Sequence, residues 1–381
     1  MNGRLDFFPK KFILIKTQVY QEELFMLYSP QEARGAILEA GERLVRQGLI
    51  ARTWGNISAR LSPTQFLITP SGRAYDSLTA DDLVTVNIAD GAYEGNIRPS
   101  SEWGVHAAAY RLRDEVGFIV HTHQFYGSIL AAAEQGQPFA PCASYGVPGT
   151  QELWEAVAQS IADHPESKNF LMAKHGALCL GSDTRESFAL AQQLEQESQA
   201  VLSCVIEGGP AVPSMGDSIR QGDSFSLTLR GKTARYPVNR VGKAAPMEAK
   251  LHAALYRGSD ATYILSVSGP YTAMYARRGR RLRSYLDDFA QIIGPDAACV
   301  RPENVSRAAG KRSALLLPGA GGLAYGATLS DVQASAMILE KNCAAALYAE
   351  TVSASPMSMA DSRAQREFYL HHYSQQITQN M

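Results

Sequence analysis

The chain has 381 residues, and its 36 Lys and Arg against 37 Asp and Glu leave no strong net charge to gather nucleic acid. With 45% hydrophobic and 19% charged residues it has the composition of a globular protein, and its length favours two domains. No segment approaches the 18 uncharged apolar residues of a membrane helix, and the five cysteines are scattered. We therefore expect a cytoplasmic protein with buried, reduced thiols and neither a nucleic-acid nor a membrane partner.

Helices and short strands follow one another through the first half of the chain. Residues 1–28 are interpreted as an N-terminal extension, because a helical pattern begins only at Ser29-Pro30, where a capping serine precedes proline. Short strands are predicted near 55–58, 66–69, 83–86, 117–123 and 170–172, with helices opening near 99, 150 and 184. Short antiparallel-type strands among helices predict an α/β (α+β) layered fold.

The second half of the chain repeats the first. After a polar stretch at 214–245, predicted as a linker, the segment around His252 echoes the segment around His106. The strands predicted at 118–123 and 263–268 echo each other in the same way, at an offset of 145 or 146 residues. A near-constant offset over about 100 residues indicates a duplicated unit. We assign residues 29–213 to the first copy and 246–381 to a degenerate second copy.

Three histidines of the first copy have the spacing of metal ligands. His121 and His123 lie two apart on a predicted strand, so their side chains share one face. His175 follows a second strand, and the glycine after it allows a sharp turn. Three imidazoles at strand ends are typical of a catalytic zinc site, although ligand type alone leaves iron, manganese or cobalt open. The second copy has Ser266, Ser268 and Ala320 at these positions, so we interpret it as chemically inert.

Small polar residues in the first copy have the character of an anion site. Glu102 follows Ser100 and Ser101 in the first turn of a predicted helix, where backbone N–H groups favour an anion. A plain helix cap explains the same residues equally simply. The polar segments 55–58 and 69–72 supply the small donors that a phosphate requires, without a lysine.

Together these motifs resemble the class II aldolase/adducin family. The similar segments occur in the family's order across residues 29–206: Gly55-Asn56-Ile57-Ser58, Ile68-Thr69-Pro70-Ser71-Gly72, Pro99-Ser100-Ser101-Glu102, His121-Thr122-His123 and Lys174-His175-Gly176. The resemblance implies a three-layer α/β/α fold around a mainly antiparallel sheet, here duplicated.

The resemblance also implies roles for individual residues. His121, His123 and His175 would bind Zn²⁺, and Glu102 would be either a fourth ligand or the acid/base. Tyr145 aligns with the tyrosine that sugar-phosphate aldolases contribute to a neighbouring subunit's site, although it also fits an aromatic plug of its own loop. The residues that match the family's phosphate-binding positions are Thr53, Asn56, Ser71, Gly72, Ser100 and Ser101.

The implied function is that of a metal-dependent lyase in a homo-oligomeric ring built from tandem domains. Such a lyase would cleave a ketose 1-phosphate to dihydroxyacetone phosphate and an aldehyde, with the metal stabilising an enediolate. Family members also catalyse 4-epimerisation of pentulose phosphates, dehydration of methylthioribulose phosphate and decarboxylation. Glu102 favours an aldolase over an epimerase, since the epimerases resemble Pro-Ser-Ser-Asp there, and leaves a dehydratase open. A non-catalytic, adducin-like scaffold is the alternative from another class.

Two further features are interpreted as structural. His106 lies four residues after Glu102 on the same predicted helix, and its counterpart His252 persists in the second copy, which favours a hydrogen-bonding role. The basic run of five arginines within residues 277–283 is interpreted as a solvated turn.

Overall fold

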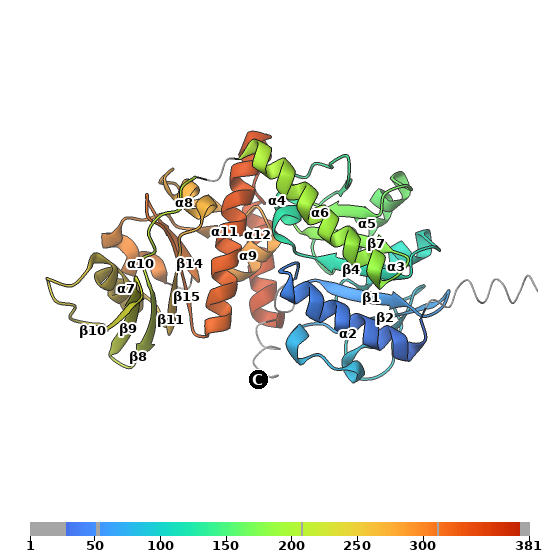
Figure 1. Cartoon of the computed structure of the whole chain (residues 1–381), viewed down its shortest axis with the longest axis horizontal. Coiled ribbons are helices and arrows are strands. Elements are labelled where there is room, and N and C mark those ends of the chain that lie inside the picture. The colour runs from blue at the N-terminus through green and yellow to red at the C-terminus, as the bar shows by residue number, and fades with distance from the viewer. Residues whose placement is uncertain (1–27, 51–53, 207–208, 311, 374–381) are drawn as a thin grey trace, which may run out of the picture. The chain divides into compact units, whose positions relative to one another are not determined.

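The computed structural model describes residues 28–50, 54–206, 209–310 and 312–373 (Figure 1). Of the predicted N-terminal extension, all but Tyr28 lies outside the described residues. The chain divides into two compact units: the first comprises residues 1–122, 146–169 and 178–192, and the second comprises 123–145, 170–177 and 193–381. The two units are thus not successive halves of the chain.

The first helix begins where the sequence predicts. Helix α2 spans Pro30–Arg46, and a reciprocal capping box closes its start. The Ser29 hydroxyl accepts from the backbone N–H of Glu32, and the Glu32 carboxylate accepts from the backbone N–H of Ser29. The buried face of α2, which includes Ile37 and Leu44, packs on strands β1 and β2.

The first sheet has seven strands in the order β3-β2-β1-β4-β7-β6-β5. Their bounds are β1 Asn56–Arg60, β2 Gln65–Ile68, β3 Val84–Asn87, β4 Phe118–Thr122, β5 Cys142–Ala143, β6 Asn169–Met172 and β7 Gly176–Gly181. Strand β1 is antiparallel to both β2 and β4, and its register places Asn56 opposite His121. Strand β5 runs parallel to β6. The sheet is therefore mainly antiparallel, as predicted.

Helices α3 (Trp103–Leu112), α4 (Phe125–Ala131), α5 (Gln151–Asp163) and α6 (Thr184–Val205) complete this part, with short 3-10 turns η1 (Tyr75–Ser77) and η2 (Ala80–Asp82). Helices α3 and α5 pack against each other, with the Trp103 and Trp154 rings 4.7 Å apart. This approach requires Gly104, because a Cβ there would lie 2.1 Å from the Trp154 ring.

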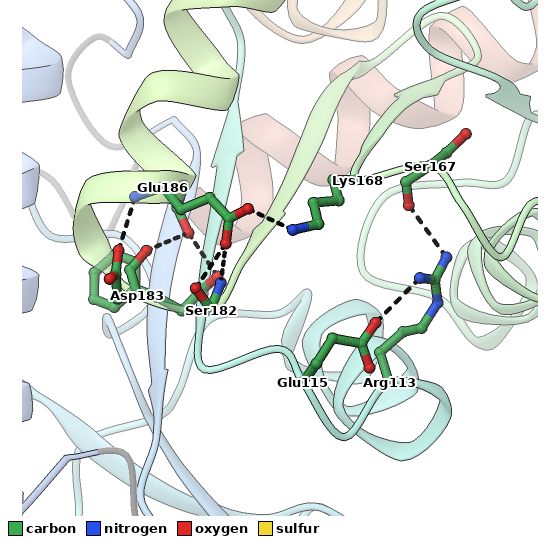
Figure 2. A network of polar contacts seen from close by, with 9 residues as sticks. Arg113, Glu115, Ser167, Lys168, Ser182, Asp183 and Glu186 are labelled. Carbon is green, nitrogen blue, oxygen red and sulfur yellow. Dashed lines mark hydrogen bonds and ion pairs between the residues drawn. The ribbon is translucent and has the colours of Figure 1, made fainter.

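Surface polar contacts fasten the start of α6 (Figure 2). The Glu186 carboxylate accepts from the backbone N–H and the hydroxyl of Ser182 and pairs with Lys168. These contacts lower the pKa of Glu186 to about 2, with the Lys168 hydrogen bond as the largest cause. Nearby, Arg113 bridges Glu115 and the carbonyl of Ser167.

The second sheet has six strands in the order β10-β9-β8-β11-β15-β14, which repeats the order β3-β2-β1-β4-β7-β6. The bounds are β8 Asp217–Gln221, β9 Ser224–Leu229, β10 Lys232–Pro237, β11 Tyr263–Val267, β14 Ala314–Leu317 and β15 Gly321–Gly326. The segment predicted as a linker, 214–245, therefore contains three strands of this sheet. Strand β10 is mostly exposed and β8 buries a single residue, so neither has the apolar pattern that would have revealed it.

The helices of the second copy are α7 Met247–Gly258, α8 Pro270–Ala276, α9 Asp287–Ile292, α10 Val305–Ala309, α11 Leu329–Thr351 and α12 Met359–Phe368. The remaining elements are the 3-10 turn η3 (Pro302–Asn304), the π-helical turn η4 (Tyr369–Tyr373) and the small β12–β13 pair (Leu282–Arg283 with Asp296–Ala297). Glu195 and Glu340, 145 residues apart, each accept backbone N–H groups at the starts of α4 and α8, respectively. This repeated helix cap supports the duplication at the level of individual contacts.

The two copies differ most in one connection. In the first copy, eleven residues lead from the end of α4 at Ala131 to Cys142, which pairs in parallel with Leu171. In the second, twenty-three lead from the end of α8 at Ala276 to Cys299, which bridges in parallel to Leu316. The second copy thus carries about twelve more residues here, and helix α9 lies within them.

A buried triad of side chains occurs in both copies. The Ser58 hydroxyl lies 2.6 Å from His106 Nδ1 and 2.7 Å from the Tyr110 hydroxyl. In the second copy, the distances from the Ser218 hydroxyl to His252 and Tyr256 are 2.7 and 2.8 Å. Because this triad is present in the copy that has no histidine cluster, it is part of the framework. The structural interpretation of His106 is confirmed.

The remaining predictions concern thiols, the basic run and the membrane. All five cysteines are free, but only Cys179 and Cys343 are buried, and Cys204 is exposed, so the expectation of uniformly buried thiols is wrong. The arginines of 277–283 are engaged within the chain; Arg278 and Arg280 both pair with Glu350. Among the described residues, no helix has the length and apolar character to cross a membrane.

Candidate metal centre

The first histidine of the predicted cluster lies at the end of a buried strand beside a carboxylate. His121 is on β4, where every residue is buried, and its Nε2 lies 3.2 Å from Glu102 Oε2. Both side chains are almost fully buried, at 1% and 9% exposure. Glu102 occupies the N-cap position of α3, one residue before the first turn to which the sequence assigned it.

The other two histidines face each other in the second unit. The rings of His123 and His175 meet edge to face with their centroids 4.6 Å apart. The turn that presents His175 is made by Lys174, which has a φ of 58°, in the left-handed region. The sequence predicts this turn from Gly176, but that glycine is the first residue of β7 and has no positive φ in the structure.

The three histidines come together as predicted from their spacing. Each offers one ring nitrogen, and these three nitrogens all lie within 4.8 Å of one another. His121 and His175 are buried and His123 is half-buried. Three imidazole nitrogens in a largely buried setting are the donor set that Zn²⁺ takes in catalytic sites, and they also suit other divalent transition metals. The residues therefore fit a divalent cation.

A chain of buried hydrogen bonds leads from the framework triad to Glu102. The Asn56 side-chain amide donates to Glu102 Oε2 at 2.8 Å, and its oxygen faces His106 Nε2. Burial, reinforced by the nearby His121, lowers the pKa of His106 to about 3, so this imidazole is neutral near pH 7. With Nδ1 accepting from Ser58, the His106 proton is assigned to Nε2, from which it is donated to Asn56.

This chain of hydrogen bonds ends on Glu102, and the second copy has no side-chain amide equivalent to Asn56. Ser58 and Ser218 hold equivalent positions, because β1 pairs with β4 in the same register as β8 pairs with β11. The residue of the second copy at the position of Asn56 is therefore Gly216. The amide that links the framework to Glu102 is thus specific to the first copy. In the structure Asn56 contacts Glu102 and His106, which gives it a second possible role beside the phosphate contact that the resemblance implies.

The two loops assigned to phosphate binding lie side by side. The backbone N–H of Ser71 donates to the carbonyl of Arg98, and that of Ser100 donates to the carbonyl of Thr69 at 3.0 Å. Gly72 has a φ of 71°, a conformation that favours glycine. Ser100 is buried, whereas Ser71, Gly72 and Ser101 are half-buried.

The structure says less about two further predicted site residues, Thr53 and Tyr145. Thr53 lies outside the described residues. Tyr145 is half-buried, two residues beyond strand β5. Its assignment as a catalytic residue stays a prediction, as does the alternative of an aromatic plug.

Sequence reasoning missed three residues that lie against the histidines. Asp287 pairs with His175, and Asp288 pairs with Lys341. The Lys341 ammonium also donates to the carbonyl of His123 at 3.3 Å. All three belong to the second copy, which was interpreted as chemically inert. The one available signal was the Asp-Asp pair in a segment without a counterpart in the first copy.

Comparison with known proteins places these observations in a family. A family model described as the class II aldolase and adducin N-terminal domain matches residues 35–202 and again 216–347. The chain therefore belongs to the class II aldolase/adducin family and carries its domain twice. The second match starts before β8, in agreement with the three strands found in the predicted linker.

Individual relatives align with less than half of this chain. A 5-methylthioribulose-1-phosphate/5-deoxyribulose-1-phosphate aldolase of Escherichia coli O45:K1 is 33% identical over 180 residues, 44% of this chain and 82% of its own length. An L-fuculose phosphate aldolase of Haemophilus influenzae is 32% identical over 42% of this chain and 77% of its own length. A methylthioribulose-1-phosphate dehydratase of Yersinia enterocolitica is 31% identical over 42% of this chain and 87% of its own length.

One solved structure adds to this comparison. An L-fuculose 1-phosphate aldolase aligns over 45% of this chain and 84% of its own, with 27% identity and a TM-score of 0.41.

Proposed function

We propose that the chain is a divalent-metal-dependent lyase that reversibly cleaves a ketose 1-phosphate to dihydroxyacetone phosphate and an aldehyde. The observation that carries this proposal is the convergence of three histidine nitrogens within 4.8 Å, with the Glu102 carboxylate 3.2 Å from His121. Zn²⁺ is the proposed cation, and Mn²⁺, Fe²⁺ and Co²⁺ are alternatives with the same ligand preference.

The bound cation would supply electrostatic stabilisation of the negative charge that develops on the substrate's vicinal oxygens as the C–C bond breaks. The chain's own residues handle the protons. In the cleavage direction a base takes the proton of the substrate hydroxyl, the C–C bond breaks, and its electron pair stays with the phosphate-bearing fragment. We assign the hydroxyl proton to Tyr145 and the proton added to the carbon of the phosphate-bearing fragment to Glu102.

The surroundings of Glu102 support this assignment. Its Oε2 accepts from the Asn56 amide, which fixes the plane of the carboxylate, and its burial keeps bulk water from the group. The adjoining loops that hold Ser71, Gly72, Ser100 and Ser101 are the proposed phosphate-binding segments, with Asn56 and Thr53 as further members. Similarity to aldolases of phosphorylated sugars supports a phosphate-bearing substrate.

Incubation of the metal-loaded chain with a panel of ketose 1-phosphates and pentulose phosphates tests the proposal. Release of triose phosphate is the expected result. Loss of water without release of triose phosphate would instead identify a dehydratase. A product that differs from the substrate only at C4 would identify an epimerase, and release of carbon dioxide from a carboxylated substrate would identify a decarboxylase. A scaffold would bind no metal and turn over nothing.

A pair of histidine variants controls the experiment. His121→Ala removes a proposed ligand and should abolish both metal binding and turnover. His371→Ala removes an exposed histidine near the end of the described chain and should change neither. Equal turnover in the His121→Ala variant and in the unmodified chain would refute metal-dependent chemistry. We also propose a homo-oligomer in the cytoplasm, and sedimentation of the purified chain tests the oligomeric state.

A further inference from the structure

The second copy places a buried carboxylate directly on one histidine of the proposed metal centre. Asp287, the first residue of α9, pairs through Oδ2 with His175 Nδ1. The Asp287 side chain is fully buried and that of His175 is 3% exposed. Because the carboxylate holds Nδ1, a cation bound by His175 would be bound through Nε2.

The backbone around Asp287 is fixed by hydrogen bonds on both sides. Its own N–H donates to the carbonyl of Lys174 at 2.9 Å, next to the histidine that it contacts. The side-chain oxygen of Asn342, on α11, accepts from the N–H groups of Tyr285 and Leu286 at 2.9 and 3.2 Å. The carboxylate is therefore presented to His175 from an anchored segment, which limits the number of orientations that the pair can adopt.

A second contact of the same segment supports His123. Asp288 is buried, pairs with the Lys341 ammonium, and lies 4.0 Å from His123 Nδ1. Lys341, only 2% exposed, donates in turn to the carbonyl of His123. Residues of α9 and α11 thus contact both histidines, one through its ring and the other through its backbone.

In the part of the chain that the structure describes, this cluster contains two buried carboxylates and two carboxylate oxygens without a hydrogen-bond partner. Two buried carboxylates face one buried lysine, and the Oδ1 atoms of Asp287 and Asp288 have no hydrogen-bond partner among the described residues. Buried carboxylate oxygens are costly unless a positive charge lies close by. A divalent cation held by the neighbouring histidines would supply that charge.

From these contacts we propose, on the basis of the function proposed above, that Asp287 is a positioning residue for metal binding: it holds His175 with Nε2 toward the cation and strengthens that nitrogen as a ligand. The second copy, through its longer α8–Cys299 connection, thereby completes the first copy's metal centre. Carboxylates that contact the far nitrogen of a metal-binding histidine typically contribute about 10- to 100-fold to metal affinity.

Metal affinity, measured on the full chain by chelator competition with Zn²⁺, tests this role without reference to turnover. Asp287→Asn keeps the shape of the side chain and should bind Zn²⁺ about 10- to 100-fold more weakly than the unmodified chain. The matched control is Asp296→Asn, which removes a carboxylate from the same connection, where it pairs with Arg281 and Arg312 rather than with a histidine. This control should keep the affinity of the unmodified chain.

A double-variant cycle separates positioning from a general loss of stability. If Asp287 acts through His175, Asp287→Asn should have little further effect on Zn²⁺ affinity in a His175→Ala background. An Asp287→Asn chain with unchanged affinity would overturn the role of Asp287 and leave the proposed lyase intact. An unmodified chain that binds no Zn²⁺ would overturn both proposals at once.

A measurement on the unmodified chain keeps the proposal falsifiable if Asp287→Asn fails to fold. Nitrogen-15 spectra of histidine-labelled protein distinguish the two ring nitrogens of His175, whose signals are assigned by their loss in His175→Ala. We expect a proton on Nδ1 and a metal-induced shift at Nε2 on addition of Zn²⁺. A metal-induced shift at Nδ1 would overturn the proposed orientation.

Discussion

The duplicated serine triad provides a matched pair of perturbations within one molecule. Ser58→Ala and Ser218→Ala each delete a hydroxyl that contacts a buried histidine and a buried tyrosine. Ser58 lies in the first compact unit and Ser218 in the second. Any difference between the two variants therefore reports what is particular to each copy.

The structure predicts that the first substitution costs more. Without the Ser58 hydroxyl, His106 Nδ1 loses its donor and the Tyr110 hydroxyl loses the partner shown for it. At roughly 1–3 kcal/mol for each of these two unsatisfied buried groups, Ser58→Ala should lower the free energy of unfolding by about 2–6 kcal/mol. Tyr256 keeps a hydrogen bond to the carbonyl of Thr262, so Ser218→Ala leaves one group unsatisfied and should cost about 1–3 kcal/mol.

Urea unfolding followed by two signals measures these costs. The three tryptophans, at positions 54, 103 and 154, all lie in the first unit, so tryptophan fluorescence follows that unit, whereas far-UV circular dichroism follows the whole chain. Ser58→Ala should shift the fluorescence transition and also weaken turnover, since the chain of bonds through His106 holds Glu102. Ser218→Ala should leave turnover unchanged. Equal effects of the two variants on turnover would refute the proposed link between the triad and Glu102.

Three further predictions follow from individual contacts. His121→Ala should reduce bound Zn²⁺ from about one equivalent per chain to none, as measured by elemental analysis, and a retained equivalent would contradict the ligand assignment. The pKa of Glu186 falls from 4.5 in the unfolded chain to about 2 in the folded one, so its stabilisation is present above pH 4.5 and is lost as the pH falls toward 2. Glu186→Gln should therefore reduce the dependence of the unfolding free energy on pH between these values, and an unchanged dependence would refute the shift. Gly104→Ala should destabilise the protein by about 1–3 kcal/mol through its clash with Trp154. Gly35→Ala has open space around its Cβ and should stabilise α2 by about 0.5–1 kcal/mol. Thermal unfolding should therefore show a lower midpoint for the first variant and a higher one for the second.

The sequence was sufficient to predict the cluster of three histidines because short-range rules fix where its members lie. His121 lies on β4 and His123 directly follows the end of that strand, and His175 follows the end of another buried strand. Strands β4, β6 and β7 were predictable for the same reason, since every residue in them is buried. Their residue types specify both the element and the edge at which it ends.

The features that escaped prediction depend on contacts between distant segments. Strands β8 to β10 are short and largely polar on their exposed side, and they are stable as strands only because β11 pairs with β8. Asp287 and His175 are separated by 112 residues, and their pairing depends on the anchoring of the α8–Cys299 connection by Asn342. Lys174, rather than the neighbouring glycine, adopts the left-handed conformation, with its ammonium paired to Glu134 and bonded to the carbonyl of Ser355.

The two copies separate framework from chemistry in a way that one copy alone would not reveal. Ser58, His106 and Tyr110 persist as Ser218, His252 and Tyr256, with distances within 0.1 Å of the originals, although the second copy has neither an Asn56 nor a histidine cluster to support. A buried hydrogen-bond network that persists without the site must stabilise the sheet itself. Asn56 then accounts for the coupling of that framework to Glu102, because it is the one link of the chain that is absent from the second copy. The second copy places two carboxylates at the start of α9, Asp287 and Asp288, against His175 and His123 of the first copy.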